Sequence, residues 1–319
     1  MILSDGRRGS DTLKSILLFL SKNKFLERII TNSSIAKKAA FRFVSGERIE
    51  DAINAARRAN EIGMTATIDH LGESVEDENL AREFTDVYID VLDQITESGV
   101  DSNISVKLTQ LGLGIDFDLC LQNFERIVER ATRLNNFVRI DMEDSPYTQK
   151  TLDIFRAVRK NYSNVGVVLQ AYLYRTEKDV EEAIENGYGL RVCKGAYTEP
   201  KEIAFPKRDQ VDKNFIYLLE MLLSEKARKN GVYVGIATHD DKIIGWTKDF
   251  AERNGIGKNE FEFQMLFGIR RDLQEELVKE GYRMRAYIPF GTYWYPYYVR
   301  RLAERLSNIL TFARTVLGE

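Results

Sequence analysis

Short apolar runs rich in β-branched residues recur along the chain, and each is separated from the next by a stretch long enough for a helix. Runs of this length and composition are typical of strands that are buried on both faces. We predict strands at residues 64–68, 104–108, 137–140, 165–171, 189–193, 232–237, 261–265 and 283–288.

Helical periodicity fills the stretches between these runs, because apolar residues return there every three or four positions. We predict helices at residues 80–98, 119–134, 150–161, 178–186, 214–230, 242–254 and 271–280. A strand followed by a helix, repeated over roughly 250 residues, is the size and rhythm of a (β/α)8 barrel. The predicted fold class is therefore α/β, a (β/α)8 TIM-like barrel.

A doubly wound sheet is the alternative α/β fold. Dinucleotide-binding members of that class carry a G-x-G-x-x-G sequence after an early strand. Gly112-Leu113-Gly114 and Gly255-Ile256-Gly257 both lack the third glycine. The barrel is the better prediction.

The first 60 residues precede the regular alternation and are helical in pattern. Leu13, Ile16, Leu17 and Leu20 share one helical face, and a second apolar stripe between residues 47 and 60 ends at Gly63, a common helix stop. We predict a helical N-terminal arm at residues 1–60 and a barrel catalytic domain at residues 61–319.

A helix with two adjacent arginines follows the last predicted strand. Tyr297, Arg300, Arg301 and Glu304 fall on one stripe of this helix, opposite an apolar stripe. Guanidinium groups grip carboxylates through paired hydrogen bonds, so the stripe suggests a clamp for a small anion. A solvated face remains the alternative from spacing alone.

The charge balance argues against nucleic acid as a partner. The 319 residues include 46 basic and 49 acidic ones, interspersed to a net charge of −3, so no basic field exists.

Cys120 and Cys193 are far apart in the sequence, which fits a reducing, cytoplasmic compartment without a disulfide. His70 and His239 are the two histidines, so we expect no metal site.

Polar residues gather at the ends of the predicted strands, where barrel enzymes place their active sites. A local ion pair would explain any one of them, but a full ring favours a site. Five cations, Lys107, Arg191, Lys194, Arg300 and Arg301, would repel one another there unless an anionic ligand arrives. The other members of the ring are Asp69, Glu73, Asp141, Glu143, Gln170, Thr238, His239, Asp240, Gln264 and Tyr287.

The turn Lys194-Gly195-Ala196-Tyr197 offers a second feature suited to an anion. Glycine lets a ligand approach the backbone closely, and lysine suits phosphate. An ordinary strand-to-helix turn is the alternative interpretation of these four residues.

The ordered motifs between about residues 64 and 308 resemble the proline dehydrogenase family in its short, monofunctional bacterial form. The resemblance implies a distorted (β/α)8 barrel that binds FAD without a Rossmann fold. The motifs are Asp69-His70-Leu71-Gly72-Glu73, and the runs at residues 104–108, 139–143, 169–172, 191–197, 237–239, 263–266 and 297–304.

Roles carried over from this resemblance fall into two groups. For proline, Arg300 and Arg301 would hold the carboxylate and Glu73 would pair with Arg300 as a gate, while Lys107, Asp141, Tyr287, Tyr297 and Leu266 would line the ring. Asp141, Arg191, Lys107 and Tyr287 would be catalytic. FAD would contact Ile140, Gln170, Arg191, Val192, Lys194, Gly195, Ala196, Tyr197, Thr238, His239, Gln264 and Glu304.

The resemblance implies oxidation of L-proline to Δ1-pyrroline-5-carboxylate, with electrons passed to a quinone through peripheral membrane contact. A separate pyrroline-5-carboxylate dehydrogenase is expected, because the chain has no room for the second domain of bifunctional relatives. Asp240 and Thr198 stand where larger members have Asn and Trp, which puts those FAD contacts in doubt.

Three alternatives stay open at this point. A lysine Schiff-base aldolase on the same barrel would use Lys107 or Lys194 as its nucleophile. A non-catalytic carboxylate-binding module would bind a ligand without electron transfer. A hydroxyproline dehydrogenase is the third, although Tyr287 favours proline because relatives acting on hydroxyproline have a smaller residue there.

Overall fold

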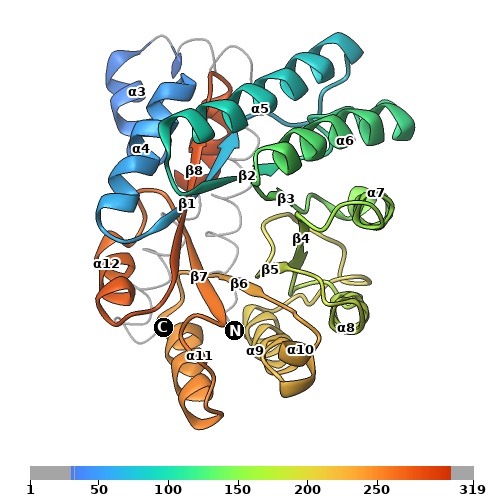
Figure 1. The fold of residues 1–319 in the computed structure, drawn as a ribbon, viewed down its shortest axis with the longest axis vertical. Coiled ribbons are helices and arrows are strands. Elements are labelled where there is room, and N and C mark those ends of the chain that lie inside the picture. The colour runs from blue at the N-terminus through green and yellow to red at the C-terminus, as the bar shows by residue number, and fades with distance from the viewer. Residues whose placement is uncertain (1–29, 32, 303–319) are drawn as a thin grey trace, which may run out of the picture.

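The computed structural model describes residues 30, 31 and 33–302, and its centre is a closed barrel of parallel strands (Figure 1). The strands follow chain order around the barrel, and β8 closes it against β1 with Ile68 opposite Ile288. The strands are β1 (Thr65–His70), β2 (Ser102–Val106), β3 (Val138–Ile140), β4 (Val165–Gln170), β5 (Leu190–Cys193), β6 (Val234–Ala237), β7 (Phe261–Leu266) and β8 (Met284–Phe290). The predicted (β/α)8 fold is confirmed.

Helices surround the barrel on its outside. They are α4 (Ile49–Glu61), α5 (Glu78–Ser98), α6 (Phe117–Arg133), α7 (Ser145–Arg159), α8 (Thr176–Asn186), α9 (Arg208–Leu222), α10 (Glu225–Lys229), α11 (Asp241–Arg253) and α12 (Arg271–Lys279). The single helix predicted at 214–230 was wrong, because the Ser224 side chain accepts a hydrogen bond from the Ala227 backbone N–H and begins α10 as a new helix.

The strands separate apolar from polar residues by their alternation. In β3, Val138 and Ile140 are fully buried in the main core between strands and helices. Because successive side chains point to opposite faces, Arg139 and Asp141 are directed into the barrel. The interior of this barrel is thus lined by charged and polar groups, while its outer face forms the apolar core.

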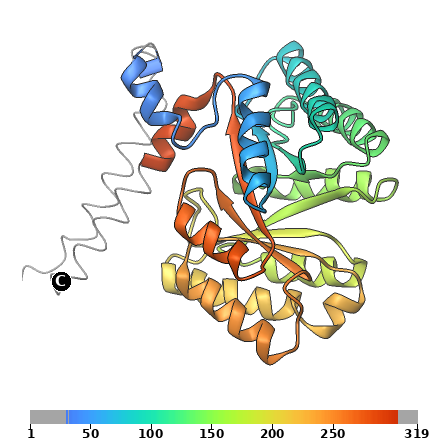
Figure 2. The same cartoon turned by 60° about the vertical axis from the view of Figure 1, so that its left-hand side comes forward.

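Two segments that are distant in sequence meet beside the barrel mouth. Helix α3 (Ser34–Ala40) lies next to the helical residues 294–302 that follow β8 (Figure 2). An apolar cluster of Ala40, Phe43, Val44, Leu71, Trp294, Tyr295, Tyr297 and Val299 joins them. The backbone N–H groups of Ser45 and Gly291 donate to Pro289 and Gly46, each at 2.9 Å, so the segment before α4 is fastened to the end of β8.

The N-terminal predictions extend beyond what the structure describes. The stripe containing Leu13, Ile16, Leu17 and Leu20 lies outside the described residues. Helix α4 shares the main core with the barrel through Ala52, Ile53 and Ala56, among others. The division at residue 60 stays a prediction. Within the described residues, no helix is both long and apolar enough to cross a bilayer.

Gly268, in the loop after β7, packs closely against the segment between α3 and α4 and provides a test of that contact. It has φ +75°, and a Cβ built there would lie 1.8 Å from the carbonyl oxygen of Arg42. We expect Gly268→Ala to lower the free energy of unfolding by at least about 2 kcal/mol, because strain and the clash add. Chemical denaturation would measure this loss.

Gly245, inside α11, is the matched control. A Cβ there meets nothing within 4 Å, so Gly245→Ala should stabilise the protein by up to about 1 kcal/mol through helix propensity. Equal stability of the Gly268→Ala variant and the native protein would contradict the packing described at Arg42.

Candidate active site

A cavity of about 680 Å³ opens at the carboxyl ends of the strands. This volume falls in the range typical of sites for small molecules and cofactors. Of the residues predicted for the site, those that line the cavity are Lys107, Asp141, Gln170, Arg191, Lys194, Gly195, Ala196, Tyr197, Thr238, His239, Asp240, Gln264, Leu266, Tyr287 and Arg301.

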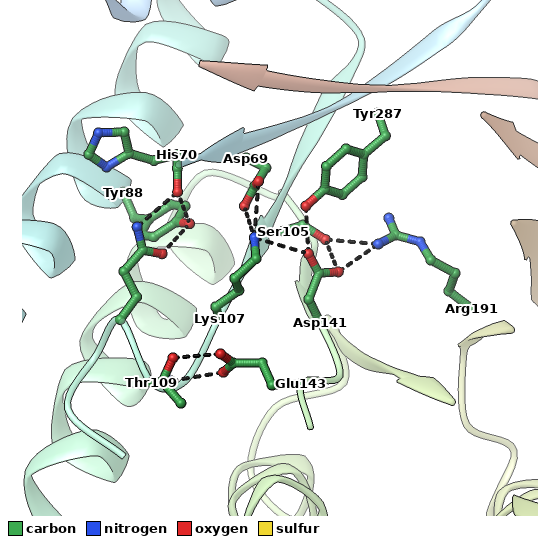
Figure 3. A network of polar contacts seen from close by, with 11 residues as sticks. Asp69, His70, Tyr88, Ser105, Lys107, Thr109, Asp141, Glu143, Arg191 and Tyr287 are labelled. Carbon is green, nitrogen blue, oxygen red and sulfur yellow. Dashed lines mark hydrogen bonds and ion pairs between the residues drawn. The ribbon is translucent and has the colours of Figure 1, made fainter. Parts of the chain in front are cut away.

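The Asp141 carboxylate, just after β3, binds groups from three other strands (Figure 3). Its Oδ1 accepts hydrogen bonds from Ser105 Oγ at 2.9 Å and Arg191 Nη1 at 2.7 Å. Its Oδ2 accepts from the Tyr287 hydroxyl at 2.6 Å and lies 3.8 Å from Lys107 Nζ. One carboxylate thus fixes two cations and a phenol at the wall of the cavity.

Lys107 is held in the charged form by carboxylates on both sides. Its Nζ donates to both oxygens of Asp69, at 2.9 and 3.1 Å, and Asp69 is fully buried. Burial alone would lower the pKa of Lys107, but Asp69 and Asp141 raise it above its ordinary value. A nucleophilic lysine needs the opposite shift, so this environment argues against a Schiff base at Lys107.

Arg191 is held in place by several partners. Its Nε donates to Gln264 Oε1, its Nη1 donates to Ser105 Oγ at 3.1 Å, and its guanidinium lies 5.2 Å from the centre of the Tyr287 ring. Gln264 in turn donates to Glu262, which accepts from Arg285 at 2.7 Å. The charges alternate in sign across the interior, which limits the cost of burying them.

Lys194 also lines the cavity and is paired with carboxylates. Its Nζ donates to Asp240 Oδ2 at 2.7 Å and also contacts Asp212. Burial would raise the pKa of Asp240, but the hydrogen bond and charge of Lys194 bring it below the usual range. Asp240 is therefore a charged partner for Lys194.

Gly195, the next residue, brings the chain against an aromatic ring. It has φ +113°, and a Cβ there would lie 2.5 Å from the ring of Tyr172. Only glycine fits this approach without a shift of the ring or the backbone. The turn at residues 194–197 is therefore packed tightly at the cavity wall.

The two adjacent arginines take different positions. Arg300 Nη1 donates to Glu73 Oε1 at 2.6 Å, and neither residue lines the cavity. Arg301 lines the cavity, and its guanidinium lies 5.3 Å from the centre of the Tyr297 ring. The two arginines thus connect the cavity, through Arg301, to the loop between β1 and α5, through Arg300.

The remaining predicted site residues are not in the cavity lining. Ile140 and Val192 are fully buried in the main core, so their side chains pack outside the cavity. Tyr297 packs in the cluster beside α3. Glu304 lies outside the described residues.

Sequence reasoning missed several residues of this site. Ser105 lies two positions before Lys107, so strand alternation could have placed it in the barrel. Glu262 and Asp212 pair with Arg285 and Lys194, but no motif marks either of them. Among the described residues, no three His, Cys, Asp or Glu side chains converge as metal ligands.

A histidine lies beside this network in an apolar environment. His70, at the end of β1, stacks on Phe290 with ring centres 4.8 Å apart and packs against Phe84. Burial, with a smaller effect from the charge of Lys107, lowers the pKa of His70 to about 4. The imidazole is therefore neutral at physiological pH.

Comparison with known proteins gives concordant matches. A family model described as "Proline dehydrogenase" matches residues 52–312. Proline dehydrogenase 2 of Bacillus subtilis (strain 168) is 45% identical over 296 residues, which cover 93% of this chain and 96% of that protein. Proline dehydrogenase of Deinococcus radiodurans is 41% identical over 274 residues, covering 84% of this chain and 87% of that protein.

A solved structure shares the fold. Proline utilization A from Bdellovibrio bacteriovorus, inactivated by N-propargylglycine, superposes with a TM-score of 0.80 over 94% of this chain at 24% sequence identity. The matched region is 37% of that longer chain, and at this identity the likeness speaks for the fold alone.

His70→Phe tests the acid sensitivity of the site. The pKa of His70 is about 4 in the folded protein and about 6.5 when unfolded, so the unfolded state binds more protons as pH falls between these values. The native protein should lose about 2 kcal/mol of stability through His70 at pH 5, and the variant should not.

Denaturation of both proteins at pH 8 and pH 5 makes the comparison. At pH 8 the His70 imidazole is neutral in both the folded and the unfolded protein. The measurement at pH 8 therefore controls for packing changes caused by the substitution. An equal loss of stability in both proteins on acidification would remove His70 as the origin.

Proposed function

Because the chain belongs to the proline dehydrogenase family, we propose that it oxidises L-proline to Δ1-pyrroline-5-carboxylate, with FAD as bound cofactor and a quinone as electron acceptor. The observation that carries the proposal is the Asp141 network, which fixes Lys107, Arg191 and Tyr287 around the wall of one cavity. Each of these residues comes from a different strand, so the arrangement depends on the closed barrel.

The residues of the cavity fit FAD. Arg191, Lys194 and Arg208 supply positive charge for an anionic cofactor, and Gln170 and Gln264 supply amide groups. The close approach at Gly195 leaves backbone at the cavity wall next to Lys194, an arrangement suited to phosphate. When bound, FAD would accept the hydride from C5 of proline and pass the two electrons to the quinone.

Arg191 would act on the charge that develops during this transfer. Its guanidinium is already oriented by Gln264, Ser105 and Asp141, so no reorganisation is needed when negative charge builds nearby. Such preorganised charge is an effective source of transition-state stabilisation.

The proline would lie between the Asp141 network and the two arginines. Arg301, with Arg300, would bind its carboxylate, while Lys107, Tyr287 and Leu266 would contact the ring. Tyr297, predicted for the ring as well, would act through Arg301, whose guanidinium lies against it. Its nitrogen must also lose a proton as the C5–N double bond forms. We assign that proton to water, because Lys107 is already protonated between two carboxylates.

The arrangement also favours proline over its alternatives. Tyr287 is held by its hydrogen bond to Asp141 and by the contact of its ring with Arg191, and we infer that this fixed, bulky side chain disfavours a substrate with an extra ring hydroxyl. A Schiff-base aldolase is disfavoured because Lys107 and Lys194 are each bound to two carboxylates. A purely carboxylate-binding module would not need the buried Asp141 network.

The acceptor and the product imply two partners. Quinones reside in membranes, so we propose peripheral contact at the inner membrane face of the cell. A separate pyrroline-5-carboxylate dehydrogenase would consume the product.

Absorbance spectroscopy tests the proposed reaction directly. The purified protein, reconstituted with FAD, should show visible flavin absorbance that bleaches when L-proline is added without oxygen and returns with a soluble quinone. A protein that takes up no flavin, or whose bound flavin L-proline leaves oxidised, would refute the proposal. Borohydride with a carbonyl substrate is the companion measurement, and a covalent lysine adduct would favour the aldolase.

Arg301→Met tests the carboxylate clamp. We expect the KM for proline to rise about tenfold or more, because a charge-assisted hydrogen bond to the substrate is lost, while flavin content stays normal. Arg57→Met, on the exposed face of α4, is the control and should leave KM unchanged. If Arg301→Met keeps the native KM, Arg301 is not part of the clamp.

A further inference from the structure

The loop at residues 71–77 joins β1 to α5 and carries Glu73. Hydrogen bonds to residues elsewhere in the chain hold it in place. The His70 carbonyl before it accepts hydrogen bonds from Gln110 Nε2 at 2.8 Å and the Tyr88 hydroxyl at 3.2 Å. The Ser74 N–H donates to Thr109 Oγ1 at 3.0 Å, and the Val75 N–H to the Thr109 carbonyl at 3.2 Å. Glu73 therefore lies between two points of attachment to residues 109–110.

Ser74 has a conformation that requires such support. Its φ is +54°, in the left-handed region, where a residue with a Cβ pays roughly 1–2 kcal/mol. The side chain of Ser74 is exposed, so packing does not explain the conformation. The backbone bonds of Ser74 and Val75 to Thr109 are what oppose this strain.

Thr109 is itself fixed by a buried carboxylate. Glu143 Oε1 accepts from the Thr109 N–H at 3.0 Å, and Glu143 Oε2 accepts from the Thr109 hydroxyl at 2.5 Å (Figure 3). Because the Ser74 N–H already points at Thr109 Oγ1, the hydroxyl proton must go to Glu143. The result is a series of hydrogen bonds in which Ser74 donates to Thr109 and Thr109 donates to Glu143.

Glu143 is well placed as the fixed end of this chain. It is 4% exposed, and within the described part of the chain it has no cation within 4 Å. Its backbone carbonyl accepts from Gln170 Nε2 at 3.0 Å, which ties it to β4. A buried carboxylate without a cation is costly unless its hydrogen bonds are satisfied, so its bonds to Thr109 are strongly favoured.

We propose that Thr109, fixed by Glu143, is a positioning residue that sets the loop at residues 71–77 and thereby places Glu73 against Arg300. Neither Thr109 nor Glu143 lines the cavity, so they act through the loop and not on the reacting atoms. The inference rests on the proposed function, because Arg300 matters to catalysis only if it helps to bind the substrate carboxylate.

The Thr109→Val variant removes both hydroxyl bonds and keeps the shape of the side chain. With flavin-loaded protein at pH 8, where Glu143 with its pKa of about 7 is ionised, we expect the KM for L-proline to rise about five- to tenfold. The kcat should change less than about twofold, because the Asp141 network keeps its own bonds. Thr109→Ser, which restores the hydroxyl, should return KM to near the native value.

Thr85→Val is the matched control for general damage. Thr85 is fully buried in α5, just after the loop, and its hydroxyl donates to the Ala81 carbonyl of the same helix at 2.8 Å. This substitution removes a buried hydroxyl near the loop without touching its attachment. We expect an unchanged KM for this variant.

A double-mutant cycle with Glu73→Gln separates positioning from a structural role. If Thr109 acts through Glu73, Thr109→Val should add less than about twofold to the KM of the Glu73→Gln protein. A fully additive effect, or a native KM in Thr109→Val, would overturn the inference. Should Thr109→Val not fold, Glu143→Gln takes its place with the same expectations.

The proposed function and this inference fail in different ways. If L-proline does not bleach the flavin of the native protein, the proposed function is wrong before any variant is examined. If the native protein bleaches and Thr109→Val keeps its KM, only the positioning role is lost.

Discussion

Burial of charge inside the barrel is the constraint on which the rest of this structure depends. The Asp141 carboxylate has to neutralise Arg191 and approach Lys107 at once, while Asp69 takes the other side of Lys107. Removing one partner from such a network leaves the others buried without compensation, which costs more than the bond itself contributes. The closed sheet satisfies this demand because it brings β1, β2, β3, β5 and β8 to a common mouth.

The same constraint separates the two faces of β3. Val138 and Ile140 pack with the helices, whereas Arg139 between them is buried in the interior and donates to the Gly189 carbonyl at 2.9 Å. A Cβ at Gly166 would lie 2.5 Å from Arg139 Nη1, so the small residue on β4 makes space for the guanidinium. Burial of Arg139 in the barrel thus requires glycine on the neighbouring strand.

Much of the fold and part of the site could be predicted from the sequence, for identifiable physical reasons. The strands form apolar runs between helical periods. Lys107 lies near the end of one such run and Asp141 directly follows another, so both the barrel and these members of the site could be inferred. The break before α10 was missed because apolar spacing continues through Leu222, Leu223 and Ala227 while Ser224 alone marks it. The pairing of Ser105 with Asp141, and that of Thr109 with Glu143, join residues from different parts of the barrel, and one sequence does not contain those distances.

The fastening of the segment before α4 to the end of β8 has a consequence for synthesis of the protein. The Ser45 hydroxyl donates to the Pro289 carbonyl at 3.0 Å, across 244 residues. The buried Trp294 indole donates to Glu47 at 3.1 Å and begins the helical segment that carries Arg300 and Arg301. Ser45 and Pro289 can therefore meet only after the ribosome has synthesised the 244 positions that separate them. Until then, the nascent polypeptide lacks the contacts that Ser45 and Glu47 make with the end of β8 and with the segment that carries Arg300 and Arg301.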